Sequence, residues 1–344
     1  MNFRGLAKIA TAALGLGLLA SACSSTSTTS NAANAAPASS PPAIAPYVGQ
    51  LHGGTQIAST VPADGDVNPY GVAVVPGSEG RLVAGGILVS NFNDKANVQG
   101  TGTTIVQVSP GGQASLFADI TALPAGMSCP GGVGLTTALG ILPGGWVVVG
   151  SLPTATSAEL FVSNALGGNT STEHGVPVTG NCTVVRLDLS LSPSAPPQLT
   201  SSTVIGSGYP WRANKAALVL APTGLALSRS GTLYVADTLT NSISAIPHAL
   251  TRGNALQDVA ATISIGGALN APLGMALAPN GDLVVVNGNN GNAVEITPQG
   301  RQLATKTLVR NGAGDLFGII TTSEGNLLAV NDGTNALEEF RFRG

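Results

Sequence analysis

The chain has 344 residues and a formal net charge of −3, and only 9% of its residues are charged. Gly (46 residues) and Pro (22 residues) are frequent, and 43% of the residues are hydrophobic. This composition excludes a coiled coil, which needs many charged residues, and extensive disorder, which goes with low hydrophobicity and high net charge. It also excludes nucleic-acid binding, because no basic cluster is present to neutralise phosphates. A turn-rich, mostly β protein remains.

Residues 1–22 have the order of a secretory signal peptide. Two basic residues precede an apolar stretch over 9–19, which is too short to span a hydrocarbon core of ~30 Å as a helix. Small residues then lead to Cys23. The sequence Leu-Ala-Ser-Ala-Cys over 19–23 resembles the lipobox of bacterial lipoproteins, which implies that Cys23 is lipidated and becomes the mature N-terminus. A plain signal peptide with an incidental cysteine is the alternative.

Residues 23–46 are rich in Ser, Thr, Ala and Pro and carry no charge, which is typical of a flexible tether. The folded part is then 47–344, long enough to bury the core of one large domain. We therefore expect an exported lipoprotein, periplasmic or on the outer cell surface, that touches the membrane only through its lipid. Two further cysteines, Cys129 and Cys182, predict a disulfide in such a compartment. Two buried thiols are the alternative.

An internal repeat organises the folded part. Five segments begin with Pro-x-Gly-aliphatic or a close variant, pass through a polar turn, and continue as a β-branched run. The starts are 69–71, 130–132, 222–224, 272–274 and 316–318, and the runs are 87–91, 146–150, 233–237, 283–287 and 327–331. A third strand is predicted at 104–106, 183–185, 242–244, 293–295 and 336–338. The last repeats have the length of one four-stranded propeller blade, about 40–50 residues.

A fourth, outer strand follows in most repeats, for example at 113–120 and 302–310. The chain ends after a third strand, so we predict that 56–61 supplies the missing strand and closes the ring, which removes open edges. Two insertions are expected, near 153–180 and 207–220. The predicted fold is an all-β propeller of four-stranded blades, with five repeats countable and six blades as the alternative.

The clearest copy of the repeat begins at Pro222. It reads Pro-Thr-Gly-Leu-Ala, then Gly-Thr-Leu-Tyr-Val-Ala-Asp-Thr, then Asn-Ser-Ile, and ends at Ile243. This segment resembles an NHL repeat, and 272–296 resembles a second copy. The resemblance covers 210–344 well and 65–205 loosely, and it implies a β-propeller of a kind that is usually six-bladed.

Propellers place the starts of their inner strands and the adjoining loops around a central channel, where ligands usually sit. The polar residues at equivalent positions are Asn91, Asp237, Asn287 and Asn331, with Asp332 beside them. This polar ring suits a divalent cation such as Ca²⁺, or a hydroxylated ligand, through its oxygen atoms. Alternatively, each side chain makes a turn bond at its strand end, which repetition favours because every blade needs the same turn. We therefore expect no cofactor, with a divalent cation as the alternative.

The architecture resembles the gluconolactonase-like, senescence-marker-like and streptogramin-lyase-like propeller enzymes, which implies a metal held by Glu, Asn and Asp, or a catalytic His. No Glu occurs at an equivalent strand start, and His52, His174 and His248 all lie outside the repeated inner positions. We therefore predict no catalytic residue and a binding or scaffold module in the cell envelope, a monomer with a protein or glycan partner. The alternative is a metal-dependent enzyme of the lactonase or lyase class that acts on a lactone or ester.

Overall fold

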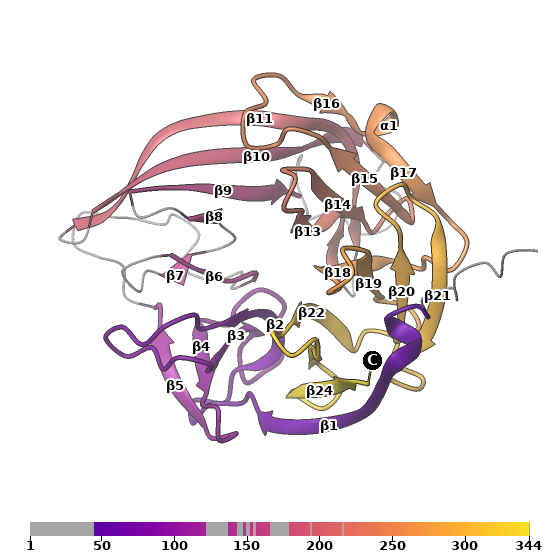
Figure 1. Cartoon of the computed structure of the whole chain (residues 1–344). Coiled ribbons are helices and arrows are strands. Elements are labelled where there is room, and N and C mark those ends of the chain that lie inside the picture. Colours follow the sequence, from indigo (N-terminus) through magenta and orange to yellow (C-terminus); the bar gives the residue numbers. More distant parts are fainter. Residues whose placement is uncertain are drawn as a thin grey trace, which may run out of the picture. The chain divides into compact units, whose positions relative to one another are not determined.

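The computed structural model describes residues 45–121, 137–142, 147–148, 152–153, 156–165, 179–192, 195–214 and 217–343. They belong to one compact unit. Within the described unit, β-sheets stand around a centre like the blades of a propeller (Figure 1). Its described helical elements are the short α1 (Asp258–Ala261) and η1 (Val48–Gln50). The predicted all-β propeller is confirmed. No helix in these ranges is long and apolar enough to cross a membrane.

Three blades consist of four strands each, and neighbouring strands in a blade are antiparallel. The first has β2 (Val67–Val74), β3 (Ile87–Asn93), β4 (Thr104–Val108) and β5 (Ala114–Asp119). The next has β13 (Pro222–Leu227), β14 (Leu233–Asp237), β15 (Ser242–Ile246) and β17 (Thr262–Ile265). The third has β18 (Pro272–Leu277), β19 (Leu283–Asn287), β20 (Asn292–Ile296) and β21 (Gln302–Thr307). In each blade the predicted start, β-branched run and third strand occupy the first three positions.

The second strand of each of these blades is buried along its whole length. Both of its faces are covered by neighbouring sheets, so each of these strands begins with a continuous apolar run rather than an alternation of apolar and polar residues. The turns before the second strands need a backbone conformation that glycine adopts without strain. Gly231, Gly281 and Gly325 have φ angles of 80°, 88° and 84° in these turns.

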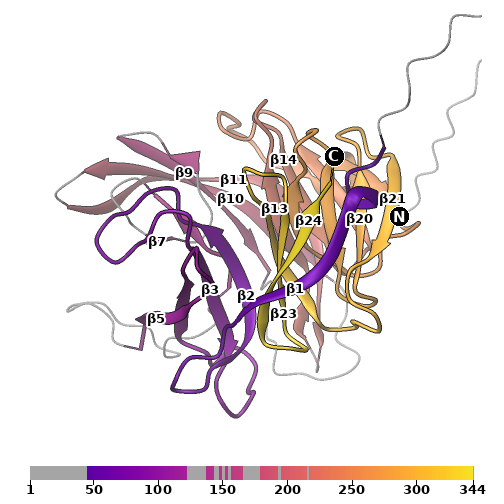
Figure 2. The ribbon, with the colours of Figure 1, turned by 60° about the horizontal axis from the view of Figure 1, so that its bottom comes forward.

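The two ends of the described unit share one blade. It has β22 (Leu316–Thr321), β23 (Leu327–Asn331) and β24 (Ala336–Phe342), with β1 (Leu51–Ser59) as the fourth strand. Leu51 lies opposite Phe342 and Ser59 lies opposite Ala336 (Figure 2). The predicted closure by an N-terminal strand is confirmed, and this strand begins five residues before the predicted 56–61.

Contacts outside the ladder hold the closing segment in place. The hydroxyl of Tyr47 donates to the carbonyl of Gly325 at 2.8 Å, and the amide of Val48 donates to the buried Glu295 carboxylate at 2.9 Å. Tyr47, Val48 and Leu51 are buried in one apolar cluster with residues of β19, β22 and β24. The chain therefore enters the propeller between two blades, at the end that carries the turns between first and second strands.

The second predicted repeat has a larger form than the others. β6 (Gly140–Ile141) pairs with β7 (Val147–Val148). The following sheet has the order β12-β11-β10-β9-β8, and β16 (Leu256–Gln257) pairs with β11. Its members are β8 (Leu152–Pro153), β9 (Ser157–Asn164), β10 (Thr179–Ser192), β11 (Ala195–Asn214) and β12 (Leu218–Leu220). The segments expected as insertions near 153–180 and 207–220 thus contribute strands, and the predicted third strand at 183–185 lies within β10.

The key glycines of the repeat lie where the inner strands of neighbouring blades meet. A Cβ atom added to any of these glycines would collide with a backbone carbonyl oxygen. The pairs of glycine and carbonyl are Gly224 and Leu273, Gly274 and Phe317, Gly318 and Tyr70, and Gly71 and Thr137. Each of these carbonyls comes from the inner strand of the next blade or, for Thr137, from the segment before β6. The predicted second start at 130–132 lies outside the described residues, and Thr137 takes the equivalent contact.

Candidate functional site

One end of the propeller gathers the polar residues predicted to line the channel. In antiparallel pairs, the start of an inner strand lies opposite the end of its second strand. Pro69 pairs with Asn91, Pro222 with Asp237, Pro272 with Asn287, and Leu316 with Asn331. We call Asn91, Asp237, Asn287, Asn331 and Asp332 the polar rim. The structure therefore places all five at the same end, each in its own blade except for the adjacent Asn331 and Asp332.

Most polar groups of the rim form hydrogen bonds within the protein. Asp237 Oδ1 accepts from the amides of Leu239 (2.9 Å) and Thr240 (3.3 Å). Asn331 accepts from the amide of Thr334 and donates to Glu338. The bonds from the backbone amides are the strand-end turn bonds that Asx residues typically make.

The other two rim asparagines differ from each other. Asn287 accepts from the amide of Asn270 at 3.0 Å and donates to the carbonyl of Ala268 at 2.8 Å. Asn91 donates to Thr60 and Thr104, but its side-chain oxygen is buried without a hydrogen-bond partner. The blade of Asn91 therefore lacks the backbone donor that satisfies Asn287.

Two rim carboxyls have shifted acidities. Burial raises the pKa of Asp237 to about 6, in spite of the backbone amides that favour its ionised form. Burial also raises the pKa of Asp332 to about 6, and the neighbouring Asp315 carboxylate adds to the rise. The amide of Asp332 donates to the carbonyl of Asp315 at 2.8 Å, so the two acids stand side by side where β22 begins and β23 has ended.

An aromatic cluster lies beside the rim. The ring of Tyr70 is 4.9 Å from that of Phe317 and 5.3 Å from that of Phe92, measured between centroids. Tyr70 and Phe317 precede two of the key glycines and come from the inner strands of adjacent blades. Burial raises the pKa of Tyr70 to about 12, so its hydroxyl stays protonated at neutral pH. The sequence analysis did not single out this cluster, although both residues fill the variable position before a key glycine.

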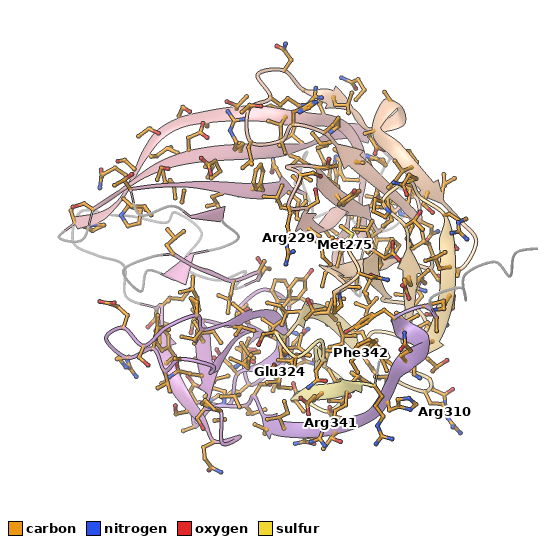
Figure 3. The ribbon with its side chains drawn as sticks, in the orientation of Figure 1. Arg229, Met275, Arg310, Glu324, Arg341 and Phe342 are labelled. Carbon is orange, nitrogen blue, oxygen red and sulfur yellow. The ribbon has the colours of Figure 1, made fainter. Side chains whose placement is uncertain are left out.

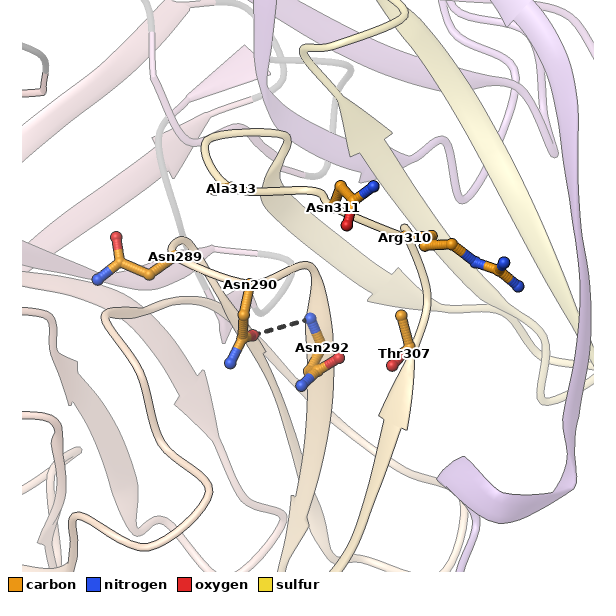
Figure 4. A pocket seen from close by; sticks show the side chains of 7 residues that line it. All are labelled: Asn289, Asn290, Asn292, Thr307, Arg310, Asn311 and Ala313. Carbon is orange, nitrogen blue, oxygen red and sulfur yellow. Dashed lines mark hydrogen bonds between the residues drawn. The ribbon is translucent and has the colours of Figure 1, made fainter.

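A shallow pocket of about 520 Å³ opens between the β19–β20 loop and the β21–β22 loop (Figure 4). It is lined by Asn289, Asn290, Asn292, Thr307, Arg310, Asn311 and Ala313. Four of these side chains are amides and one is charged, and the Asn290 side chain accepts from the Asn292 amide at 3.1 Å. The amide of Gly314 bonds to Gly288, which places this pocket next to the polar rim. Figure 3 shows Arg310 near the outer edge of the ring and Arg229 and Glu324 on turns of two other blades.

The described residues do not fit a metal held by carboxylates in the channel. The variable positions at the inner-strand starts are Tyr70, Thr223, Leu273 and Phe317, none of which carries a carboxylate. Within the described ranges, no group of three or more His, Cys, Asp or Glu side chains is placed to hold a metal ion. The chemistry that this end offers is amide and hydroxyl hydrogen bonding beside aromatic surface.

The predicted cysteine sites fall mostly outside the described residues. Cys23 and Cys129 both lie outside the described residues, and Cys182 is fully buried in β10. His52 is in β1 and the other described histidine, His248, follows β15, so neither is at the polar rim.

No family model and no curated protein matches this chain. Three solved structures illustrate what the chain is similar to. A streptogramin B lyase is 12% identical, with a TM-score of 0.46, over 83% of this chain and 97% of that one. A putative gluconolactonase is 15% identical, with a TM-score of 0.46, over 87% and 96%. The calcium-binding protein regucalcin from Agrobacterium tumefaciens is 11% identical, with a TM-score of 0.44, over 83% and 93%.

Proposed function

We propose that this chain is an exported binding module of the cell envelope that takes a neutral glycan at the polar-rim end of its propeller. The single observation that carries the proposal is the contact of Tyr70 with Phe317 across two adjacent blades. Aromatic rings combine apolar area with defined geometry, and sites for small polar ligands pair such surface with a few well-placed polar groups. The amide-lined pocket, between the β19–β20 and β21–β22 loops, supplies such groups at the same end of the propeller.

The scarcity of basic side chains in the pocket and on the rim argues against an anionic partner. Arg310 is the one charged side chain of the pocket, and the rim acids Asp237 and Asp332 have raised pKa values because they are buried. Amide groups donate and accept at once, as sugar hydroxyls do. A strongly anionic partner would find little complementary charge here.

The experiment is calorimetric titration of the full chain with oligosaccharides released from the bacterial cell envelope, in the presence of EDTA. We expect saturable binding with micromolar to millimolar affinity that persists in EDTA. Binding that is weakened at least tenfold by Asn290→Ala locates the ligand at the pocket. Absence of binding to every neutral oligosaccharide, or binding unchanged by Asn290→Ala, contradicts the proposed site.

The entry point of the chain bears on how such a site is presented. Tyr47 bonds to Gly325 in the turn between β22 and β23, which is the opposite end from the polar rim. The described chain therefore enters the propeller at the end opposite the proposed site.

A second candidate is an enzyme acting on a lactone or ester, the kind of propeller activity that the sequence left as an alternative. The observation that favours it is Asp332, because a carboxyl with a pKa of about 6 suits general acid–base catalysis near neutral pH. There it would take the proton of an attacking water. The test is hydrolysis of a lactone and ester panel by the wild type and by Asp332→Asn. Turnover lost at least a hundredfold in the variant favours this candidate, and no turnover removes it.

A further inference from the structure

We propose that the pocket between the β19–β20 and β21–β22 loops selects sugars that carry an acetamido group, which the side-chain amides of Asn290 and Asn292 hold. This inference rests on the proposed glycan-binding function and names the chemical group that the pocket recognises. Two observations support it: a departure from the repeat at Gly291, and the hydrogen-bonding groups that line the pocket at that place.

The loops between second and third strands join neighbouring blades in the same way in two places. Asn241 is the last residue of the β14–β15 loop, and its side-chain oxygen accepts from the amide of Ala271, just before the next inner strand. Asn335 is the last residue of the β23–β24 loop and accepts from the amide of Asn68. Both asparagines therefore bridge from one blade to the entry of the next.

Gly291 has this place in the β19–β20 loop. It has no side chain to reach the amide of Asp315 before β22, and that amide bonds to the carbonyl of Gly312 at 3.4 Å. A Cβ atom on Gly291 would also collide with the carbonyl oxygen of Val309. The pocket lies at this departure from the repeat, because its lining residues flank Gly291 in one loop and Gly312 in the other.

Backbone hydrogen bonds hold the two walls of the pocket together. The carbonyl of Gly291 accepts from the amides of Leu308 and Val309, each at 3.0 Å. The amide of Gly314 donates to the carbonyl of Gly288 at 2.6 Å. The walls are therefore ordered before a ligand arrives, which lowers the entropic cost of binding.

Asn290 presents a hydrogen-bond donor to the pocket. Its side-chain oxygen accepts from the backbone amide of Asn292 at 3.1 Å, which leaves its Nδ2 group for a ligand (Figure 4). The side chain of Asn292 has no hydrogen-bond partner among the described residues, so it offers both a donor and an acceptor.

An acetamido group matches these side chains better than a hydroxyl group does. Its carbonyl oxygen only accepts, which suits the Nδ2 group of Asn290, and its N–H can donate to the side-chain oxygen of Asn292. Ala313 lines the same pocket and offers apolar surface to the acetyl methyl group. The guanidinium of Arg310 points away from Asn290 and Asn292 in Figure 4, which favours a neutral carbonyl over a carboxylate between these amides.

The test is calorimetric titration of the full chain with N,N′-diacetylchitobiose and with cellobiose. These disaccharides have the same linkage and differ by the acetamido group that replaces a hydroxyl on each ring. We expect the dissociation constant to be at least tenfold lower for diacetylchitobiose, because a site that bonds a polar group rejects the analogue without it. Cellobiouronate is the third ligand, and tighter binding of this carboxylate than of diacetylchitobiose would overturn the proposal.

Asn290→Asp is the variant that tests the free donor. It keeps an oxygen that accepts from Asn292 and replaces the Nδ2 group by a second oxygen. We expect it to lose the preference for diacetylchitobiose over cellobiose. Asn97→Asp is the matched control, because it adds the same charge in the exposed β3–β4 loop and keeps the oxygen that accepts from Asn93. This control should retain the preference.

The outcomes separate the acetamido group from the glycan-binding function. If envelope oligosaccharides bind but the wild type does not prefer diacetylchitobiose to cellobiose, the acetamido inference is overturned and the glycan-binding function stands. Binding of no oligosaccharide contradicts the function itself. A preference that persists in Asn290→Asp, or that Asn97→Asp loses equally, also overturns recognition by the pocket amides.

Discussion

The carbonyl oxygen of Phe317 occupies the space that a Cβ atom on Gly274 would need. The same relation recurs between Gly224 and Leu273 and between Gly318 and Tyr70, so glycine sets how closely the inner strands approach. We expect Gly274→Ala to lower the free energy of unfolding by about 3 kcal/mol, because a rigid backbone atom must move. Urea unfolding measures this. Gly77→Ala, with no atom within 4 Å of the added Cβ, should stay within about 0.5 kcal/mol of the wild type.

The closing strand should carry a large share of the stability. Leu51 is fully buried at the start of β1, among residues from β19, β22 and β24. We expect Leu51→Ala to lower the free energy of unfolding by about 2–5 kcal/mol, since it removes buried apolar volume. Val61→Ala is the control, because Val61 is 39% exposed just beyond the strand. Equal effects of the two variants in urea unfolding would contradict closure through β1.

The raised pKa of Asp237 predicts that the free energy of unfolding depends on pH. Its pKa is raised to about 6 in the folded chain, so the native state binds the proton more tightly than the unfolded state. The protonated carboxyl of Asp237 therefore stabilises the folded chain fully at low pH, and this contribution is lost as the pH rises from about 4 to about 6. We expect a loss of about 2 kcal/mol over this window, which Asp237→Asn removes. The same loss in Asp237→Asn as in the wild type, followed by urea unfolding at each pH, would refute this assignment.

The predicted disulfide can be tested on the whole chain. Cys182 is fully buried in β10, so a bond from it to Cys129 would be shielded from reductant. We expect the intact mass of the non-reduced chain to be two hydrogens lower than that of the reduced chain. A disulfide closing this span stabilises by roughly 3–4 kcal/mol, so reduction should also lower the Tm. Identical masses would show two thiols.

The sequence was sufficient to predict most of the fold. The second strands β14, β19 and β23 have the predicted bounds, because an apolar run between a glycine turn and an Asx residue has few other solutions. β9 was missed, because it lies outside the repeat and no glycine turn marks it. The third strand predicted at 183–185 lies within β10, but the full length of the β10–β11 hairpin was missed.

The candidate site was only half predictable. The polar rim followed from the repeat, because equivalent positions must lie at one end of the blades. The hydrogen bonds of the polar rim could not be predicted from the repeat. Asn91 and Asn287 have the same place in the pattern, but the loops that precede their blades differ and give them different partners. The contact of Tyr70 with Phe317 joins the first and last repeats, which only the closed ring brings together.

The most direct test of the proposed function is calorimetric titration of envelope oligosaccharides into the wild type and two aromatic variants. Tyr70→Ala removes the centre of the aromatic cluster, whereas Phe117→Ala removes a ring of the outer strand β5 that contacts Arg81. We predict that Tyr70→Ala weakens glycan binding at least tenfold and that Phe117→Ala leaves it unchanged. Equal affinities in all three proteins would contradict a glycan site at the polar-rim end of the propeller.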